Sequence, residues 1–247
     1  MRLKIGLNLT NHYSLNFSTP KRDKKLIKFI IIHYTGMKRE SEAIKRLCDR
    51  KYKVSSHYFV KNNGGIVSLV PDLYEAWHAG KSRWQRFKSL NRYSIGIEIN
   101  NPGHSNGYSS FSSKQIYSLT KLLSYLLREY KIDKNNVLGH SDIAPDRKKD
   151  PGEKFPWKNL FKNKLCKWHN LNERKIRKFR KIKISNEEES IFLKNLYKFG
   201  YSKISSSMLK NKILLVKAFQ RRFRQSLING KIDKECLLIS KNISKNA

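Results

Sequence analysis

The pattern of hydrophobic and polar positions changes period repeatedly along the first two thirds of the chain. Continuous apolar runs or strict alternation predict strands at residues 26–34, 55–60, 66–70, 94–100 and 136–140. Apolar positions at helical spacing predict a short helix over 41–51 and a longer helix over 114–130. Strands interleaved with helices are typical of an α/β domain, so we expect a mixed central β-sheet flanked by helices.

The last third of the chain shows only the helical period. It predicts three short helices, at residues 187–199, 210–227 and 233–239, and Asp233 is a suitable N-cap for the third. We therefore expect a small C-terminal three-helix domain beside the α/β domain. The predicted parts are an N-terminal arm at 1–25, the α/β domain at 26–165, a basic linker at 166–185 and the helical domain at 186–247.

The segment 138–157 carries two candidate metal ligands on an irregular loop. His140 follows a short apolar strand, Asp150 comes ten residues later, and prolines at 145, 151 and 156 exclude a long helix between and after them. A third candidate, His33, lies near the end of the first predicted strand. Two imidazoles and one carboxylate, with a fourth position left for water, form a known catalytic zinc arrangement. From spacing alone, hydrogen-bonded structural histidines at strand ends are the commoner alternative.

The composition is strongly basic, and its few cysteines exclude two kinds of cysteine-based site. The formal net charge is +34, shared equally between residues 1–160 and the shorter segment 161–247. Such a charge favours polyanions, namely nucleic acid, anionic lipid or anionic cell-wall polymer; a compositional bias with solvated lysines explains it equally well. Three widely spaced cysteines exclude a disulfide framework and a thiolate zinc cluster.

The sequence contains no transmembrane segment, because it has no run of eighteen apolar residues. The N-terminus has a broken apolar patch and is a poor secretory signal, which favours the cytoplasm. Export by another route would place the protein in the periplasm or cell envelope.

Several short blocks, taken together, resemble bacterial zinc-dependent N-acetylmuramoyl-L-alanine amidases, which share a fold with peptidoglycan-recognition proteins. The blocks are HYTG at 33–36, SHY at 56–58, AWHAG at 76–80, SIGIEI at 94–99, GHSDIAP at 139–145, RK at 147–148 and DPG at 150–152. They span roughly residues 27–160 and occur in the order seen in that family. The C-terminal helices resemble, more loosely, a peptidoglycan-binding three-helix module.

The resemblance implies a role for each matching residue. It implies His33, His140 and Asp150 as ligands of Zn²⁺, Glu98 as the general acid and base, and Lys148 as the cation that faces the oxyanion. Without it, Glu98 is a carboxylate on the face of a strand opposite three isoleucines, and Lys148 is one lysine among many.

Four further residues are candidates for substrate binding: Trp77, His78, His57 and Asn91. Packing or anchoring of a loop is an equally open role for each of them.

The expected function is hydrolysis of the amide between the lactyl group of N-acetylmuramic acid and L-alanine, in peptidoglycan or in muropeptides. Alternatives are a non-catalytic peptidoglycan-binding protein of the same fold and, with charge as its only support, a basic nucleic-acid-binding protein. We expect a peptidoglycan or muropeptide partner, no specific nucleic acid and a monomer.

Overall fold

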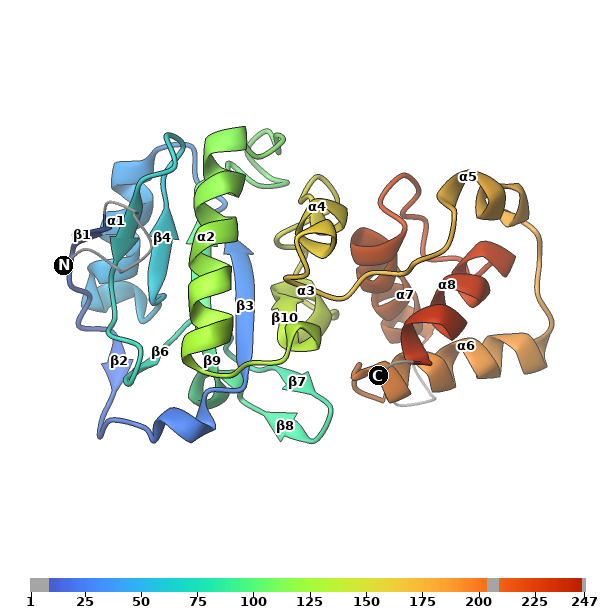
Figure 1. The fold of residues 1–247 in the computed structure, drawn as a ribbon, viewed down its shortest axis with the longest axis horizontal. Coiled ribbons are helices and arrows are strands. Elements are labelled where there is room, and N and C mark those ends of the chain that lie inside the picture. The colour runs from blue at the N-terminus through green and yellow to red at the C-terminus, as the bar shows by residue number, and fades with distance from the viewer. Residues whose placement is uncertain (1–8, 204–208, 246–247) are drawn as a thin grey trace.

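The computed structural model describes residues 9–203 and 209–245, and its centre is a six-stranded mixed sheet (Figure 1). The strand order is β1-β5-β4-β9-β3-β10, and every neighbouring pair is parallel except β4 and β5, which form an antiparallel hairpin. These strands are β1 (Leu9–Asn11), β3 (Phe29–Tyr34), β4 (Tyr58–Val60), β5 (Ile66–Ser68), β9 (Ser94–Ile99) and β10 (Val137–Gly139). The expected fold class, a mixed central sheet flanked by helices, is confirmed.

Helices and two small sheets surround this central sheet. The α-helices are α1 (Glu40–Cys48), α2 (Ser113–Glu129), α3 (His140–Ile143), α4 (Trp157–Lys162), α5 (Glu173–Ile176), α6 (Asn186–Phe199), α7 (Leu209–Phe223) and α8 (Lys234–Ser244). The small sheets pair β2 (Phe17–Ser18) with β6 (Glu75–Ala76), and β7 (Arg83–Trp84) with β8 (Phe87–Lys88). No helix in the described part of the chain has the length and apolar character needed to cross a membrane.

The two longest N-terminal helices cover opposite faces of the sheet, because successive side chains of a strand point to opposite faces. On one face, Ala43 and Leu47 of α1 pack against Phe59 of β4 and its neighbours on the hairpin. On the other, the leucines of α2 enter the main core together with Val60 and the isoleucines of β3 and β9. Figure 1 shows α2 lying along the sheet. The two predicted amphipathic helices therefore lie with their apolar faces against the sheet.

The N-terminal segment from residue 9 onward is part of the fold and not the loose arm that we expected. Strand β1 pairs with β5, β2 pairs with β6, and the buried Arg22 donates to the backbone carbonyls of three residues of the first domain. Strands of two or three residues are too short to show a period, which is why the sequence did not reveal them. Residues 1–8 lie outside the described residues.

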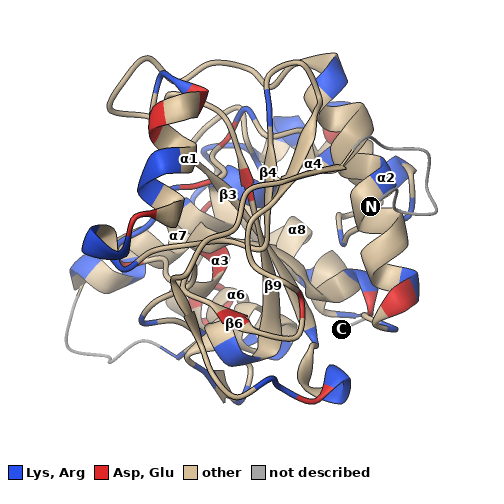
Figure 2. Ribbon diagram, turned by 90° about the vertical axis from the view of Figure 1, so that its left-hand side faces the viewer, with Lys and Arg blue, Asp and Glu red and all other residues tan. Residues whose placement is uncertain are grey.

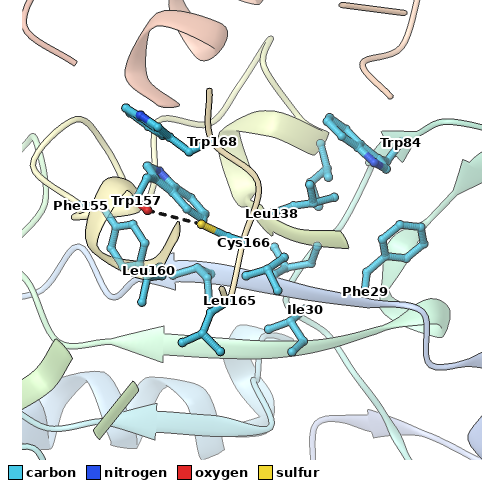
Figure 3. Close-up of a cluster of buried hydrophobic side chains, with 14 of the residues drawn as sticks. Phe29, Ile30, Trp84, Leu138, Phe155, Trp157, Leu160, Leu165, Cys166 and Trp168 are labelled. Atoms are coloured by element: carbon cyan, nitrogen blue, oxygen red, sulfur yellow. Dashed lines mark hydrogen bonds between the residues drawn. The ribbon is translucent and has the colours of Figure 1, made fainter. Parts of the chain in front are cut away.

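The three C-terminal helices form a group at the end of the molecule opposite α1 (Figure 1). Their apolar residues belong to the same continuous core as the central sheet, so they pack directly on the first domain. The basic segment before them also contributes to this core: Leu165, Cys166 and Trp168 pack near Ile30 and Trp157 (Figure 3). Asp233 caps α8 by accepting a hydrogen bond from the amide of Cys236, and this helix extends to Ser244.

Candidate metal centre and active-site pocket

Parallel strands bring the candidate residues to one edge of the sheet. His33 lies near the carboxyl end of β3 and is aligned with Glu98 near the end of the neighbouring β9. His140 comes directly after β10, the strand on the other side of β3, and begins the one-turn helix α3. Since parallel strands end at the same edge, three side chains separated by up to 107 residues meet there.

Three ligand atoms converge at this edge. The Nδ1 atoms of His33 and His140 lie 2.9 Å apart, and Oδ2 of Asp150 lies 3.1 Å and 3.0 Å from them. All three residues are buried, and within the described chain they form the one group of three or more such side chains compact enough to bind a metal ion. The sequence analysis singled out the same three residues.

Hydrogen bonds from the far side of each imidazole fix its orientation. Nε2 of His140 donates to the carbonyl oxygen of Ala79 at 3.2 Å, and Nε2 of His33 lies 3.0 Å from Nδ1 of His78. A histidine whose Nε2 carries the proton has a lone pair on Nδ1, the atom that faces the other candidate ligands. Ligand histidines in metal sites characteristically make a second hydrogen bond of this kind.

The charges of the centre suit a divalent cation. Burial, reinforced by the neighbouring His140, lowers the pKa of His33 to about 4, so its imidazole is neutral at pH 7. Burial alone would raise the pKa of Asp150, but the two adjacent imidazoles hold it well below its usual range. The centre thus combines an ionised carboxylate with a neutral His33.

The pKa of Glu98 is shifted in the opposite direction from that of Asp150. Burial and the nearby Asp150 raise its pKa to about 8, with Lys148 acting in the opposite direction. Its Oε2 atom is buried and has no hydrogen-bond partner among the described residues. An unpaired carboxyl whose pKa lies near neutrality is characteristic of a group that exchanges protons.

The centre lies on the wall of a pocket of about 480 Å³. Glu98, Lys148 and Trp77 also line the pocket, so the two predicted catalytic side chains and the metal centre share one cavity. The basic side chains on the wall are Arg46, Arg147, Lys148 and Lys149. The cavity therefore favours an anionic or strongly polar ligand.

The four predicted substrate-binding residues occupy different kinds of position. Trp77 lines the pocket and donates from Nε1 to the hydroxyl of Ser18 at 2.9 Å. His78 also reaches the pocket, but it is buried and contacts His33, so its position supports the orientation of this candidate ligand. His57 and Asn91 do not line the pocket.

His57 and Asn91 bind the protein backbone instead. Nδ1 of the fully buried His57 accepts from the amide of Gly96 at 2.9 Å. Oδ1 of Asn91 accepts from the amides of His78 and Ala79 at 3.1 and 2.7 Å, which anchors the loop beneath the centre. The sequence suggested substrate contact for both residues, and the structure gives them supporting positions, because their polar atoms already have partners within the fold.

The sequence analysis missed a polar cluster on the rim of the pocket. His104 stacks on Tyr108 with ring centroids 4.4 Å apart, and it hydrogen-bonds Tyr34 at 2.8 Å and Glu153 at 3.1 Å. His104 comes from the irregular segment after β9, where nothing in the sequence pattern distinguishes it. Only the fold brings the four side chains together.

The positive charge is not confined to one surface. Figure 2 shows Lys and Arg spread over most of the helices and loops in view, with few Asp and Glu between them. Such a distribution is typical of solvated lysines on a basic protein.

Comparisons with known proteins agree with this geometry. Residues 22–153 match the family model described as N-acetylmuramoyl-L-alanine amidase. The chain is 34% identical over 226 residues to the N-acetylmuramoyl-L-alanine amidase AmiD of Escherichia coli, covering 87% of this chain and 81% of AmiD.

Two solved structures are similar over nearly the whole chain. The complex of E. coli AmiD with anhydro-N-acetylmuramic acid-L-Ala-D-γ-Glu-L-Lys has a TM-score of 0.80 at 31% identity, covering 93% of this chain and 92% of that one. The complex of Pseudomonas aeruginosa AmpDh3 with anhydromuramic pentapeptide has a TM-score of 0.78 at 28% identity, covering 93% and 94%. Both matches extend beyond the α/β domain into the C-terminal helices.

Proposed function

Since the chain belongs to the N-acetylmuramoyl-L-alanine amidase family, we propose that it hydrolyses the amide between the muramyl lactyl group and L-alanine at a zinc centre formed by His33, His140 and Asp150. The observation that carries this proposal is the convergence of three ligand atoms on the wall of a pocket that also contains Glu98 and Lys148.

The donor set fits zinc in type and in spacing. Ligand atoms placed 2.0–2.1 Å from a tetrahedral zinc ion lie about 3.3 Å from one another. The three candidate atoms are separated by 2.9–3.1 Å, so a small adjustment accommodates the ion. Two imidazoles and a carboxylate leave the fourth position to the pocket, as in catalytic zinc sites. When bound, zinc polarises an amide carbonyl and makes water nucleophilic near neutral pH.

Glu98 supplies the proton transfers of the hydrolysis. Its carboxylate takes a proton from the attacking water and returns it to the nitrogen of L-alanine as the amide C–N bond breaks. The products are a muramyl carboxylate and the protonated amine of L-alanine, which together hold both protons of the water. Removal from bulk water favours this role because it raises the pKa of Glu98 toward the working pH.

Lys148 stabilises the negative charge that develops on the carbonyl oxygen. Its side chain lies on the same wall and acts electrostatically on both Glu98 and His33. A positioned donor of this type contributes about 3–4 kcal/mol to stabilisation of the transition state in other hydrolases. Lys148→Ala is therefore expected to reduce kcat by about 10²- to 10³-fold.

The substrate class follows from the pocket and from the relatives. The two similar structures contain anhydromuramyl peptides, whose stem peptides carry carboxylates. Arg46, Arg147 and Lys149 give the pocket a charge complementary to such a ligand. We propose anhydromuramyl and related muramyl peptides as substrates, with Trp77 as an apolar contact on the wall.

A metal-dependence assay tests the proposal. Protein stripped with a chelator and then reloaded with zinc is incubated with a muramyl peptide and with intact murein, and released peptide amine is measured. Zinc is expected to restore cleavage, while Asp150→Ala abolishes it. The matched control is Asp146→Ala, which alters an exposed carboxylate of the same loop that does not line the pocket. Zinc-loaded protein that binds muramyl peptide and never cleaves it would show a binding protein of the same fold.

A further inference from the structure

Arg222 of the C-terminal helix α7 reaches into the first domain and binds the segment that presents His140. We infer that Arg222 is a positioning residue for this metal ligand, so that the C-terminal helices contribute directly to the geometry of the catalytic centre. The inference rests on the proposed function, because it concerns how well His140 is oriented toward the metal.

Arg222 binds the chain on both sides of His140. Its Nη1 donates to Oδ2 of Asp142 at 2.5 Å, and its Nη2 donates to the carbonyl oxygen of Val137 at 3.0 Å. Val137 is the first residue of β10, and Asp142 lies two residues after His140. The guanidinium therefore links the start of the strand to the turn after it.

Asp142 transmits this contact to the backbone on which His140 depends. Its Oδ2 atom also accepts from the amide of Gly139 at 2.8 Å, which closes the one-turn helix α3 around His140. Its Oδ1 atom accepts from the hydroxyl of Tyr201, a second residue of the C-terminal part, at 2.6 Å. Both carboxylate oxygens thus have donors from beyond the first domain.

The environment makes these contacts strong and directional. Arg222 and Asp142 each have only 1% of the side chain exposed, so solvent does not screen their charges. The guanidinium carbon lies 4.3 Å from the ring centroid of Trp157, which fixes the plane of the group. A buried charge pair is weak evidence for added stability, since apolar packing would join two domains as well. Its directional hydrogen bonds, in contrast, orient a specific backbone turn.

The chain provides a matched control in Arg224, two residues further on. Arg224 is equally buried and forms an ion pair with Asp233, with Glu235 3.6 Å away. Those partners belong to the C-terminal part and do not contact the segment around His140. Loss of Arg224 therefore tests the cost of breaking a buried ion pair without touching the metal centre.

The experiment compares Arg222→Met, Tyr201→Phe and Arg224→Met in the full chain. Zinc affinity is measured by competition with a chromophoric chelator, cobalt coordination by visible absorption, and folding by thermal unfolding. We expect Arg222→Met to weaken zinc binding by about 10-fold, less than the 10- to 100-fold typical of losing a direct partner of a ligand, because Arg222 acts on His140 only through the backbone around it. Its cobalt spectrum is expected to change, and kcat to fall more than KM rises.

Arg224→Met is expected to lower the unfolding temperature while its zinc affinity and cobalt spectrum stay as in the wild type. Tyr201→Phe removes one of the two contacts on Asp142 and is expected to have a smaller effect on affinity than Arg222→Met. If Arg222→Met does not fold, the double variant with Asp142→Asn removes both buried charges together, and the same loss of zinc affinity is expected of it.

The inference is overturned if folded Arg222→Met, or the double variant, binds cobalt with the wild-type spectrum and zinc with wild-type affinity. It is also overturned if Arg224→Met weakens zinc binding as much as Arg222→Met does. Wild-type protein that binds no zinc contradicts the proposed function instead, so the two failures are distinguishable.

Discussion

Glu98→Gln is predicted to remove activity and, in the metal-free protein, to increase stability at neutral and alkaline pH. The carboxyl of Glu98 has a raised pKa and one buried oxygen without a partner. Ionising such a group in the folded state is unfavourable, whereas in the unfolded chain it is freely solvated. A neutral amide of the same shape avoids this cost but cannot exchange a proton.

The sign and size of the stability change follow from the pKa values of Glu98 in the folded and unfolded states. Its pKa is about 8 in the folded protein and 4.5 ordinarily, so between these values the folded state binds one more proton than the unfolded state. Stability is therefore greatest below pH 4.5 and falls as the pH rises toward 8. Each pH unit corresponds to about 1.4 kcal/mol, giving an upper limit of about 5 kcal/mol. Because Glu98 lines a pocket open to water, we expect about 1–3 kcal/mol.

The assay is denaturant unfolding at several pH values between 5 and 8, with chelator present throughout. The measured quantity is the difference in unfolding free energy between the wild type and Glu98→Gln, which cancels the other titrating groups. As the pH rises, the unfolding free energy of the variant is expected to increase relative to that of the wild type. With zinc restored, kcat of the variant is expected to fall about 10²- to 10⁴-fold.

Glu153→Gln is the control, because the pKa of Glu153 is shifted in the opposite direction from that of Glu98. The hydrogen bond from His104 lowers the pKa of Glu153, so its ionised form stabilises the folded state above the ordinary carboxyl range. Removing that carboxylate should not make the protein more stable as the pH rises. A Glu98→Gln variant whose stability difference stays constant from pH 5 to 8 would refute the reasoning, because Glu98 would then be as well solvated in the folded state as in the unfolded state.

Three further predictions concern the support of the metal centre. His78→Ala removes the partner of His33 Nε2 and should weaken zinc binding about 10- to 100-fold, as measured by chelator competition. Gly96→Ala places a methyl group 2.4 Å from the ring of His78, so it should lower both zinc affinity and unfolding temperature; unchanged values would show that the ring moves freely. Arg22→Met leaves the backbone carbonyls of Asp72, Asn91 and Arg92 without their donor, and should cost about 2–4 kcal/mol in denaturant unfolding; a loss below about 0.5 kcal/mol contradicts this.

Three buried histidines close to one another have different roles, and the sequence does not distinguish these roles. His33, His57 and His78 all lie in or next to strands, and all three are buried. His33 is a candidate ligand because its Nδ1 faces His140 and Asp150, whereas His78 faces the back of His33 and His57 faces the backbone of β9. The direction of each ring depends on sheet register and loop packing, which no local pattern contains.

The sequence alone determined the order of the main elements and the chemistry available to them. The apolar runs at β3 and β10 and the alternation at β9 predicted three strands of a mixed sheet, with His33, Glu98 and the segment after residue 139 at or near their ends. The helical period of α2, α6, α7 and α8 predicted the ends of these helices to within five residues. The candidate ligands followed from residue type together with a family resemblance.

Tertiary structure decided everything that depends on contacts between distant segments. It joined residues 9–22 to the sheet, assembled His104 with Glu153 at the rim, and brought Arg222 to Asp142 across 80 residues of chain. Short strands and isolated polar residues have no period, so their partners are fixed only when the core packs. The physical reason is that periodicity reports which face of an element is buried, while the partner that covers this face is chosen by the whole fold.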